Sequence, residues 1–228
     1  NKVPEKIGPI RSARPYLIKI AEEYDALLLH AGASPEGFSL LAENLVDHLD
    51  QISKSKYYWR SSDRRAPHNL YTGEDLLQEY LKKQSVKEYK ERFTFQRFSI
   101  VKSDKSKAEK IEIPFWGGNT VFYLYNRDDN KYYRYHKSIK NPHIVNNVQL
   151  TADNIIIQYV KTRVIDNIGR LAMELESQGK AIIIKDGVLN KGTWKKKGNI
   201  YTMFYDKDGR KVSLNPGQTW VELVPDSL

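Results

Sequence analysis

Hydrophobic and polar positions follow two different periods along the chain, and the change of period divides it into two parts. In the first part, apolar residues recur at the spacing of a helix that packs one face on a core. In the second part, apolar and polar residues largely alternate, as they do in half-buried strands. The pattern predicts an α/β part followed by a part built mainly of strands.

The first part contains three predicted helices and a strand. The first helix has Ser12 as its expected cap and Pro15 in its first turn, where the missing N–H costs little. The sequence YDALLLHAG, residues 24–32, predicts a short buried strand. The second helix is expected to begin with Ser34 as its cap and Pro35 at its first position.

The third helix is expected after Thr72. Thr72 and Asp75 have the spacing of a capping box, with Asp in place of the usual Glu or Gln. Its apolar stripe, which we expect to face the core, consists of Leu76, Leu77, Tyr80 and Leu81.

A polar, lysine-rich passage without helical periodicity, SIVKSDKSKAEKIE, separates the two parts. It predicts a linker near residues 102–107. We therefore expect an N-terminal α/β module over residues 1–102 and a C-terminal antiparallel β module over residues 103–228.

Strand patterns with short turns fill the second part. TVFYLY and KYYRYH alternate on either side of the turn NRDDNK and predict a hairpin. A second hairpin is expected in NIYTMFYDKDGRKVSL, with Asp208 and Gly209 at its turn. Further strands are expected in NIIIQYV, RLAMELES, KAIIIKDG and QTWVELV. About eight strands of this kind predict an antiparallel sandwich or open barrel, so the fold class is α+β.

Composition removes several classes of chemistry. The chain has no cysteine, which excludes disulfides, thiol nucleophiles and thiolate metal sites. This absence fits an extracytoplasmic protein and also fits chance. No apolar run approaches the roughly 20 residues of a membrane-spanning helix. The net charge of +9 is spread out apart from Lys195–Lys197, and it suits a nucleic acid, an anionic membrane or a cell-wall polymer equally well.

Enzyme signatures are absent from the sequence. It has no phosphate-binding glycine loop, no His-Glu-x-x-His helix and no Gly-x-Ser-x-Gly elbow. We expect no cofactor and no metal, because the histidines never fall three or four residues apart; they are His30, His48, His68, His136 and His143.

Two segments, residues 8–15 and 57–69, hold five of the twelve arginines. Arginine offers a rigid fork of donors that fits phosphate and carboxylate groups. The candidate anion-binding residues are Arg11, Arg14, Arg60, Asp63, Arg64, Arg65, His68 and Asn69. The alternative is that the arginines are structural, pairing with Asp47, Asp50 or Asp63 and bonding loop carbonyls. His68 could likewise serve as an acid or base or as a structural histidine.

Aromatic residues are frequent in the predicted strands of the second part. Their polar tips predict an exposed or half-exposed sheet, and a stacking platform for bases or sugars is the alternative. We expect Lys195–Lys197 to form a solvated hairpin edge. The aromatic residues are Tyr123, Tyr125, Tyr132, Tyr133, Tyr135, Trp194, Tyr201, Phe204 and Tyr205.

The strings GPIRSARPY, YDALLLHAGASPEGFSLL, YYWRSSDRRAPHNLYT, KGTWKK and PGQTWVELVP occur in this order. In these strings the chain resembles the YerB-like family of bacterial lipoproteins over nearly its whole length. The resemblance implies two domains of unknown function, on a secreted protein held at the outer face of the plasma membrane by a lipidated N-terminal cysteine. It implies no activity and no catalytic residues.

The chain departs from this family at its beginning. The signal peptide, the lipid-anchor cysteine and further N-terminal sequence of the family do not precede GPIRSARPY here. We expect a fragment whose first module is incomplete at its N-terminus and whose membrane anchor lies on the missing segment.

The leading hypothesis is an extracytoplasmic binding module with an arginine-lined cleft for an anionic cell-envelope ligand. One alternative is a hydrolase or transferase for phosphate- or glycan-containing envelope substrates, with Asp63 or His68 as base. Another is a structural or interaction lipoprotein that uses a tyrosine-rich patch. Nucleic-acid binding is the least favoured, and the sequence leaves open both the oligomeric state and whether the protein is an enzyme.

Overall fold

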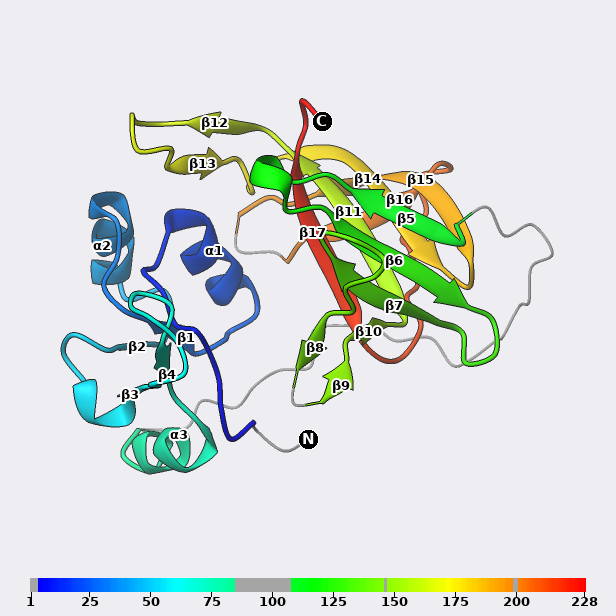
Figure 1. The fold of residues 1–228 in the computed structure, drawn as a ribbon. Helices are drawn as coiled ribbons and strands as arrows, with labels where there is room; N and C mark the ends of the chain where they lie inside the picture. The colour runs from blue at the N-terminus through cyan, green and yellow to red at the C-terminus, as the bar shows by residue number, and fades with distance from the viewer. Residues whose placement is uncertain (1–3, 85–107, 146, 199–200) are drawn as a thin grey trace. The chain divides into compact units, whose positions relative to one another are not determined.

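The structure is a computed structural model that describes residues 4–84, 108–145, 147–198 and 201–228. The chain divides into a first unit, residues 1–92, and a second unit, residues 93–228. The predicted α+β class with a strand-rich second part is confirmed (Figure 1). The predicted linker and the boundary at residue 102 lie outside the described residues.

The first unit contains three helices and two pairs of short strands. Its elements are α1 (Pro15–Glu23), β1 (Leu28–His30), α2 (Pro35–Ala42), β2 (His48–Asp50), the 3-10 turn η1 (Ser55–Tyr57), β3 (Trp59–Arg60), β4 (Leu70–Tyr71) and α3 (Glu74–Leu81). Strands β1 and β2 are parallel and are connected through α2, which makes a βαβ unit. Strands β3 and β4 form an antiparallel hairpin.

Three expected helix caps have different outcomes. Ser34 caps α2 as expected, because its hydroxyl accepts a hydrogen bond from the N–H of Gly37. Ser12 does not cap α1, since Arg14 occupies the cap position without a side-chain hydrogen bond. Thr72 does not cap α3, which begins after Gly73. The Thr72 hydroxyl instead donates to the carbonyl of Tyr57 at 2.8 Å, so a tertiary contact replaces the local capping motif.

The second unit contains two sheets and two additional ribbons. Its elements are β5 (Lys110–Ile113), η2 (Trp116–Gly118), β6 (Val121–Asn126), β7 (Lys131–His136), β8 (Ile144–Val145), β9 (Val148–Gln149), β10 (Thr151–Ala152), β11 (Asn154–Val160), β12 (Thr162–Val164), β13 (Leu171–Met173), β14 (Gln178–Lys185), β15 (Val188–Lys195), β16 (Met203–Asp206) and β17 (Thr219–Pro225). One sheet has the order β10-β7-β6-β5 and the other β16-β15-β14-β11-β17. Only β11 and β17 run parallel among these neighbours.

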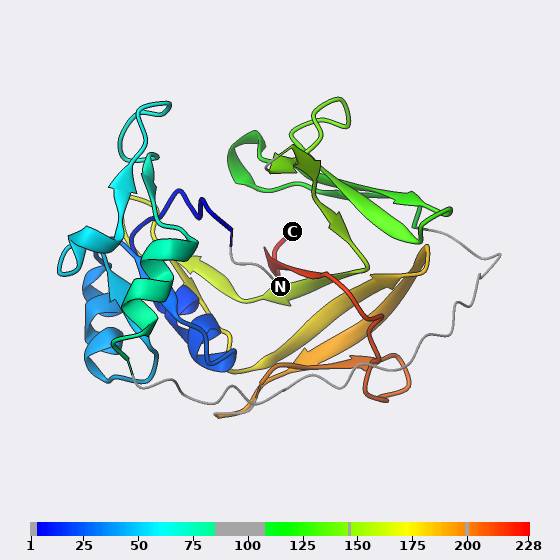
Figure 2. The same ribbon diagram turned by 90° about the horizontal axis from the view of Figure 1, so that it is seen from below.

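The two sheets face each other in the view from below (Figure 2). Residues from both sheets form one apolar core. Strands β5, β6 and β11 contribute alternate residues to this core, as their period predicts: Ile111 and Ile113, Val121 and Tyr123, and Ile155 and Ile157. Ile155 and Val160 of β11 are fully buried. The β6–β7 hairpin has the predicted strands and turn.

Two strand predictions need correction. In RLAMELES only Leu171–Met173 is a strand, and it pairs with β12, which the sequence analysis did not anticipate. Beyond the turn at Gly209, the chain makes only a bridge between Tyr205 and Lys211, so β16 has β15 as its strand neighbour and no hairpin partner.

The expectation of exposed aromatic strands is also wrong at three positions. Tyr123, Tyr132 and Trp194 have at most 1% of their surface exposed. Each polar tip has a partner inside the unit: the Trp194 indole donates to the carbonyl of Tyr159, and the Tyr132 hydroxyl accepts from the N–H of Gly187. Burial of Lys196 likewise contradicts a fully solvated Lys195–Lys197 edge.

A buried ionic network crosses the core between the sheets. Arg134 of β7 and Glu222 of β17 are 8% exposed and lie 3.4 Å apart, between Nη2 and Oε1. The Tyr123 hydroxyl donates to Glu222 at 2.6 Å and accepts from Arg134 Nε at 3.1 Å. The Arg134 guanidinium also lies over the ring of Trp220, 4.4 Å from its centroid. These contacts compensate two charges that would be costly to bury alone.

Removal of one charge of this pair should destabilise the second unit strongly. We expect Arg134→Met or Glu222→Leu alone to cost about 3–5 kcal/mol, because each leaves the other charge buried without its partner. The double variant should lose much less than the sum of the two. Urea unfolding followed by tryptophan fluorescence measures the cycle, and additive losses would contradict the coupling.

Candidate functional site

The two arginine segments meet because the N-terminal segment lies along β4. Ile10 N–H donates to the carbonyl of Leu70, and Ile7 and Thr72 exchange two backbone hydrogen bonds. Gly8 between them has a φ of +152° and lies against Tyr71, where an added Cβ would come within 2.5 Å of the ring. The glycine therefore permits the close approach that brings residues 8–15 to the β3–β4 hairpin.

Arg11 contacts His68 across this junction. Its Nη1 lies 2.7 Å from His68 Nδ1, although 57 residues separate the two along the chain. Because a guanidinium only donates, His68 must accept with Nδ1 and carry its proton on Nε2 while neutral. Both side chains are exposed. The structure thus brings the two segments together at this pair.

Contacts within the β3–β4 loop fix two further arginines. Arg60 donates to Asn69 Oδ1 at 2.9 Å, and Asn69 donates in turn to the carbonyl of Ser61 at 3.1 Å. Arg64 donates to the hydroxyl of Tyr71 at 3.2 Å. These neutral acceptors orient the guanidiniums without forming an ion pair, although the neighbouring Asp63 attracts Arg64 electrostatically.

Arg14 and Arg65 have different surroundings. Arg14 is half-buried and donates to the carbonyls of Ser12 and Ala13. No contact brings it to the hairpin, so it is the predicted site residue that serves the backbone of its own segment. Arg65 is exposed on the loop.

Asp63 has its own cationic partner. Its carboxylate accepts a short hydrogen bond from Ser61 and lies 3.3 Å from the ammonium of Lys6. The Ser61 hydroxyl, followed by Lys6, lowers the pKa of Asp63 below its ordinary value. In the described residues, Asp63 forms its ion pair with Lys6 and Asp50 lies near His30, not near these arginines. The structural alternative is realised at Arg14, which bonds carbonyls of its own segment.

A histidine pair that the sequence analysis missed lies on the parallel strands. His30 is 1% exposed, and its Nδ1 donates to the carbonyl of Gly32 at 3.0 Å. Its Nε2 lies 2.9 Å from Nδ1 of His48, which must therefore donate while both rings are neutral. Asp50, opposite His30 in register, accepts from the N–H of Gly32. Burial, followed by the neighbouring His30, lowers the pKa of His48.

No group of three or more metal-ligating side chains gathers anywhere among the described residues. No helix in that part of the chain is long and apolar enough to cross a membrane. The second unit has an open cavity of about 680 Å³ beside β14 and β15, with Lys161, Lys180 and Lys191 in its wall.

Acidification should destabilise the first unit through His48. Above the ordinary pKa of 6.5 this ring is neutral in both the folded and the unfolded states, so it adds no pH dependence to the free energy of unfolding. Below pH 6.5 the unfolded state binds the proton more readily than the folded state. The free energy of unfolding therefore decreases as the pH is lowered, until the lowered pKa of the folded state is passed. We expect His48→Gln to give a shallower decline in urea unfolding between about pH 7 and 5. Parallel pH profiles for variant and parent would contradict this effect.

These features define a two-unit α+β protein with an arginine-bearing hairpin on the first unit and a β sandwich as the second. Two family models match it, one for each unit. Residues 1–87 match the "Protein of unknown function (DUF3048) N-terminal domain", and residues 111–221 match the "Protein of unknown function (DUF3048) C-terminal domain". The chain belongs to the DUF3048 family.

A curated relative supports the same assignment. The Bacillus subtilis (strain 168) protein named "Putative lipoprotein YerB" is 27% identical over 234 residues, which cover 99% of this chain and 69% of that protein. The crystal structure of the Bacillus subtilis YerB protein matches with a TM-score of 0.81 at 26% identity, over 98% of this chain and 76% of that chain. The resemblance to the YerB-like family is therefore confirmed.

Proposed function

We propose that this protein is an extracytoplasmic, lipid-anchored binding protein whose β3–β4 hairpin binds an anionic group of the cell envelope. The name of the relative motivates the membrane location. The observation that carries the binding proposal is a set of exposed arginines that form no ion pair with a carboxylate among the described residues, namely Arg11, Arg60, Arg64 and Arg65.

Guanidiniums held in position by neutral acceptors favour anion binding for two reasons. Their neutral partners His68, Asn69 and Tyr71 restrict the side chains before any ligand arrives, which lowers the entropy cost of binding. Each fork also retains unused donors that suit phosphate or carboxylate oxygens. Asp63, the acid of this loop, is directed to Lys6 and Ser61.

The contacts favour binding over catalysis. Asp63 and His68, the two candidate bases, contact different partners: Lys6 and Ser61 for the first and Arg11 for the second. The lowered pKa of Asp63 also makes it a weaker base. For the interaction hypothesis, no tyrosine of the described second unit is among the strongly exposed apolar residues.

Loss of two arginines should weaken polyanion binding. We expect Arg64→Gln/Arg65→Gln to lower affinity for inorganic polyphosphate at least about tenfold, since hydrogen bonds to charged groups contribute about 1.5–3 kcal/mol each. Lys54→Gln/Lys82→Gln removes the same charge from exposed positions of the same unit and is the matched control. Calorimetric titration measures the polyphosphate affinity of both variants. Equal losses would show that binding depends on net charge and not on these arginines.

A charge-conserving change tests whether binding requires the planar guanidinium of Arg60. We expect Arg60→Lys to retain the net charge but to lower polyphosphate affinity several-fold, because an ammonium cannot hold Asn69 and a ligand oxygen in the same planar geometry. Lys54→Arg is the reverse control and should leave affinity unchanged. If Arg60→Lys binds as the parent does, the site recognises charge alone.

A further inference from the structure

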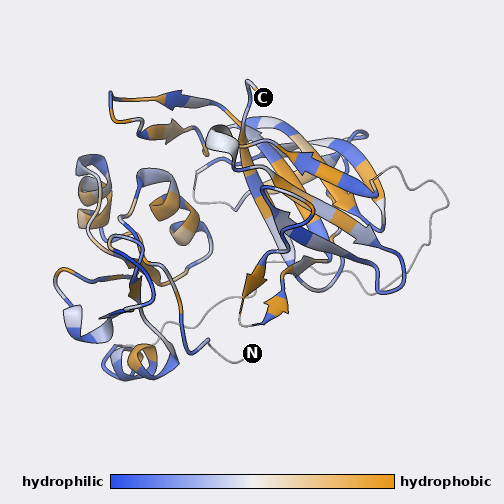
Figure 3. Cartoon of the chain, in the orientation of Figure 1, coloured by the Kyte–Doolittle hydropathy of each residue, from blue (hydrophilic) through white to orange (hydrophobic). Residues whose placement is uncertain are grey.

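The ribbon of β8 and β9 exposes apolar side chains on both of its faces. Val145 and Val148 pair directly across the ribbon and are 46% and 67% exposed, and Ile144 on the alternate face is 53% exposed. Ile139, in the loop that precedes the ribbon, is 47% exposed. Figure 3 shows β8 and β9 as hydrophobic strands that project from the second unit. Exposed clusters of this kind mark interaction surfaces.

The ribbon is firmly supported at its base by Arg134. His143 N–H donates to the Arg134 carbonyl at 3.0 Å, and Arg134 N–H donates to the carbonyl of Leu150 at 2.9 Å. The Gln149 side-chain amide donates to the same Arg134 carbonyl, and the guanidinium contacts His143 Nδ1. Because the network with Glu222 fixes Arg134, the apolar tip is held out on a rigid base.

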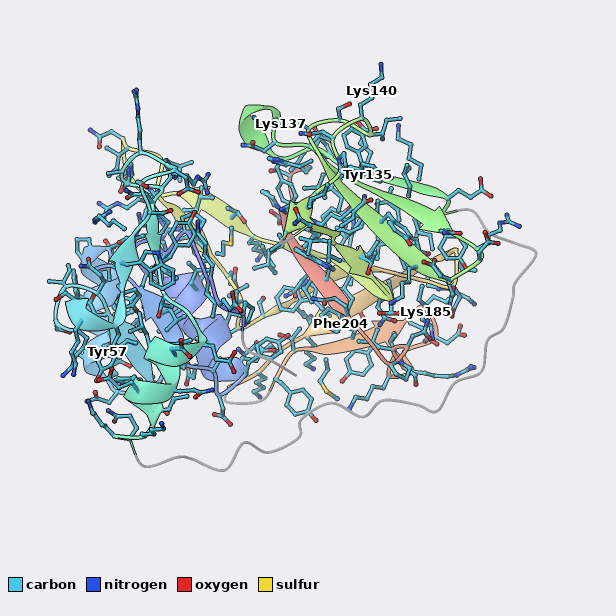
Figure 4. The ribbon with its side chains drawn as sticks, turned by 60° about the horizontal axis from the view of Figure 1, so that its bottom comes forward. Tyr57, Tyr135, Lys137, Lys140, Lys185 and Phe204 are labelled. Carbon is cyan, nitrogen blue, oxygen red and sulfur yellow. The ribbon has the colours of Figure 1, made fainter. Side chains whose placement is uncertain are left out.

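The surroundings of the ribbon are cationic. Residues 137–150 contain no Asp or Glu and two cations, Lys137 and Lys140. Lys131 and Arg134, which lie earlier in β7, are paired with Asp153 and Glu222. Lys137 and Lys140 are exposed in the loop after β7, and Figure 4 shows Lys140 projecting outward. An apolar tip flanked by cations is the pattern of an element that enters the interface of an anionic bilayer.

The β12–β13 ribbon provides a contrast within the same unit. Val164 and Ile168 are 55% and 75% exposed, so apolar exposure there is at least as large. Its two acids are paired within the ribbon, Asp166 with Arg170 and Glu174 with Lys161. Residues 161–174 therefore have a net charge of +1, from three cations and two acids, whereas residues 137–150 have two lysines and no acid. The charge balance favours the β8–β9 ribbon for an anionic surface.

We propose that the β8–β9 ribbon, with Ile139, Lys137 and Lys140, is a second membrane contact that inserts its apolar side chains into the headgroup region of an anionic bilayer. The proposal rests on the membrane location in the proposed function. A covalently tethered protein meets the bilayer at high effective concentration, so a weak contact is sufficient to orient it. The lysines contribute attraction, and Ile144, Val145 and Val148 contribute apolar burial.

Vesicle sedimentation of the full chain tests this contact. The probes are vesicles of phosphatidylcholine alone and of phosphatidylcholine mixed with phosphatidylglycerol. We expect binding to the mixed vesicles only. Lys137→Gln/Lys140→Gln should lower partitioning roughly thirtyfold, because two surface cations are removed. Ile144→Ser/Val145→Ser/Val148→Ser should lower it at least about tenfold through lost apolar burial.

A matched control changes the contrasting ribbon. Val164→Ser/Ile168→Ser removes comparable exposed apolar surface and should leave partitioning unchanged. Circular dichroism of every variant verifies that the fold is retained, which the exposed positions permit. A parent chain that fails to sediment with the mixed vesicles, or a triple-serine variant that sediments as the parent does, would overturn the proposal. Equal losses in the control variant would also overturn it, because they would indicate non-specific adsorption of exposed apolar side chains.

The arginine variant separates this proposal from the function of the first unit. Arg64→Gln/Arg65→Gln should retain vesicle binding while it loses polyphosphate binding, and the triple-serine variant should show the opposite pattern. Loss of vesicle binding in the arginine variant alone would assign the membrane contact to the β3–β4 hairpin and refute the role of the ribbon. Failure of polyphosphate binding with intact vesicle binding would refute only the proposed function of the first unit.

Discussion

The contact between Arg134 and Glu222 is the constraint on which the second unit depends. It joins β7 of one sheet to β17 of the other inside a core that is otherwise apolar. Two buried charges are tolerated there because Tyr123 hydrogen-bonds to both and Trp220 covers the guanidinium. The same arginine fixes the base of the β8–β9 ribbon through its backbone, so the interior of the sandwich and its projecting surface share one residue.

Periodicity predicted the strands whose environment is uniform. TVFYLY and KYYRYH became β6 and β7, and NIIIQYV became the buried strand β11. Periodicity failed to predict burial where a polar residue faces inward. The alternation in KYYRYH places Arg134 on the same face as the fully buried Tyr132, and that coincidence was the available signal for an interior charge. The tyrosines were assigned to the surface because their hydroxyls need partners, and those partners come from strands distant in sequence, such as Glu222.

The arginine segments were identifiable from composition, but their pairing was not. Arg11 reaches His68 only because the N-terminal segment runs along β4, and no local motif specifies that course. The different environment of Arg14, which serves carbonyls of its own segment, is equally a tertiary result. The same reason explains why the histidine pair escaped notice: His30 and His48 come together through the parallel pairing of β1 and β2.

The two positively charged features of the chain have different chemistry, and the difference indicates different ligands. On the β3–β4 hairpin the charge is carried by arginines that neutral hydrogen-bond acceptors hold in place, among exposed polar neighbours. Such forks discriminate by geometry and suit discrete anionic groups. Around the β8–β9 ribbon the exposed charge is carried by Lys137 and Lys140 of the preceding loop, and the ribbon itself exposes Ile144 and Val148. Flexible ammonium groups add long-range attraction without geometric demands, and the apolar side chains need a medium that can bury them. A fluid anionic bilayer meets both conditions, whereas a polar polymer would satisfy only the charge.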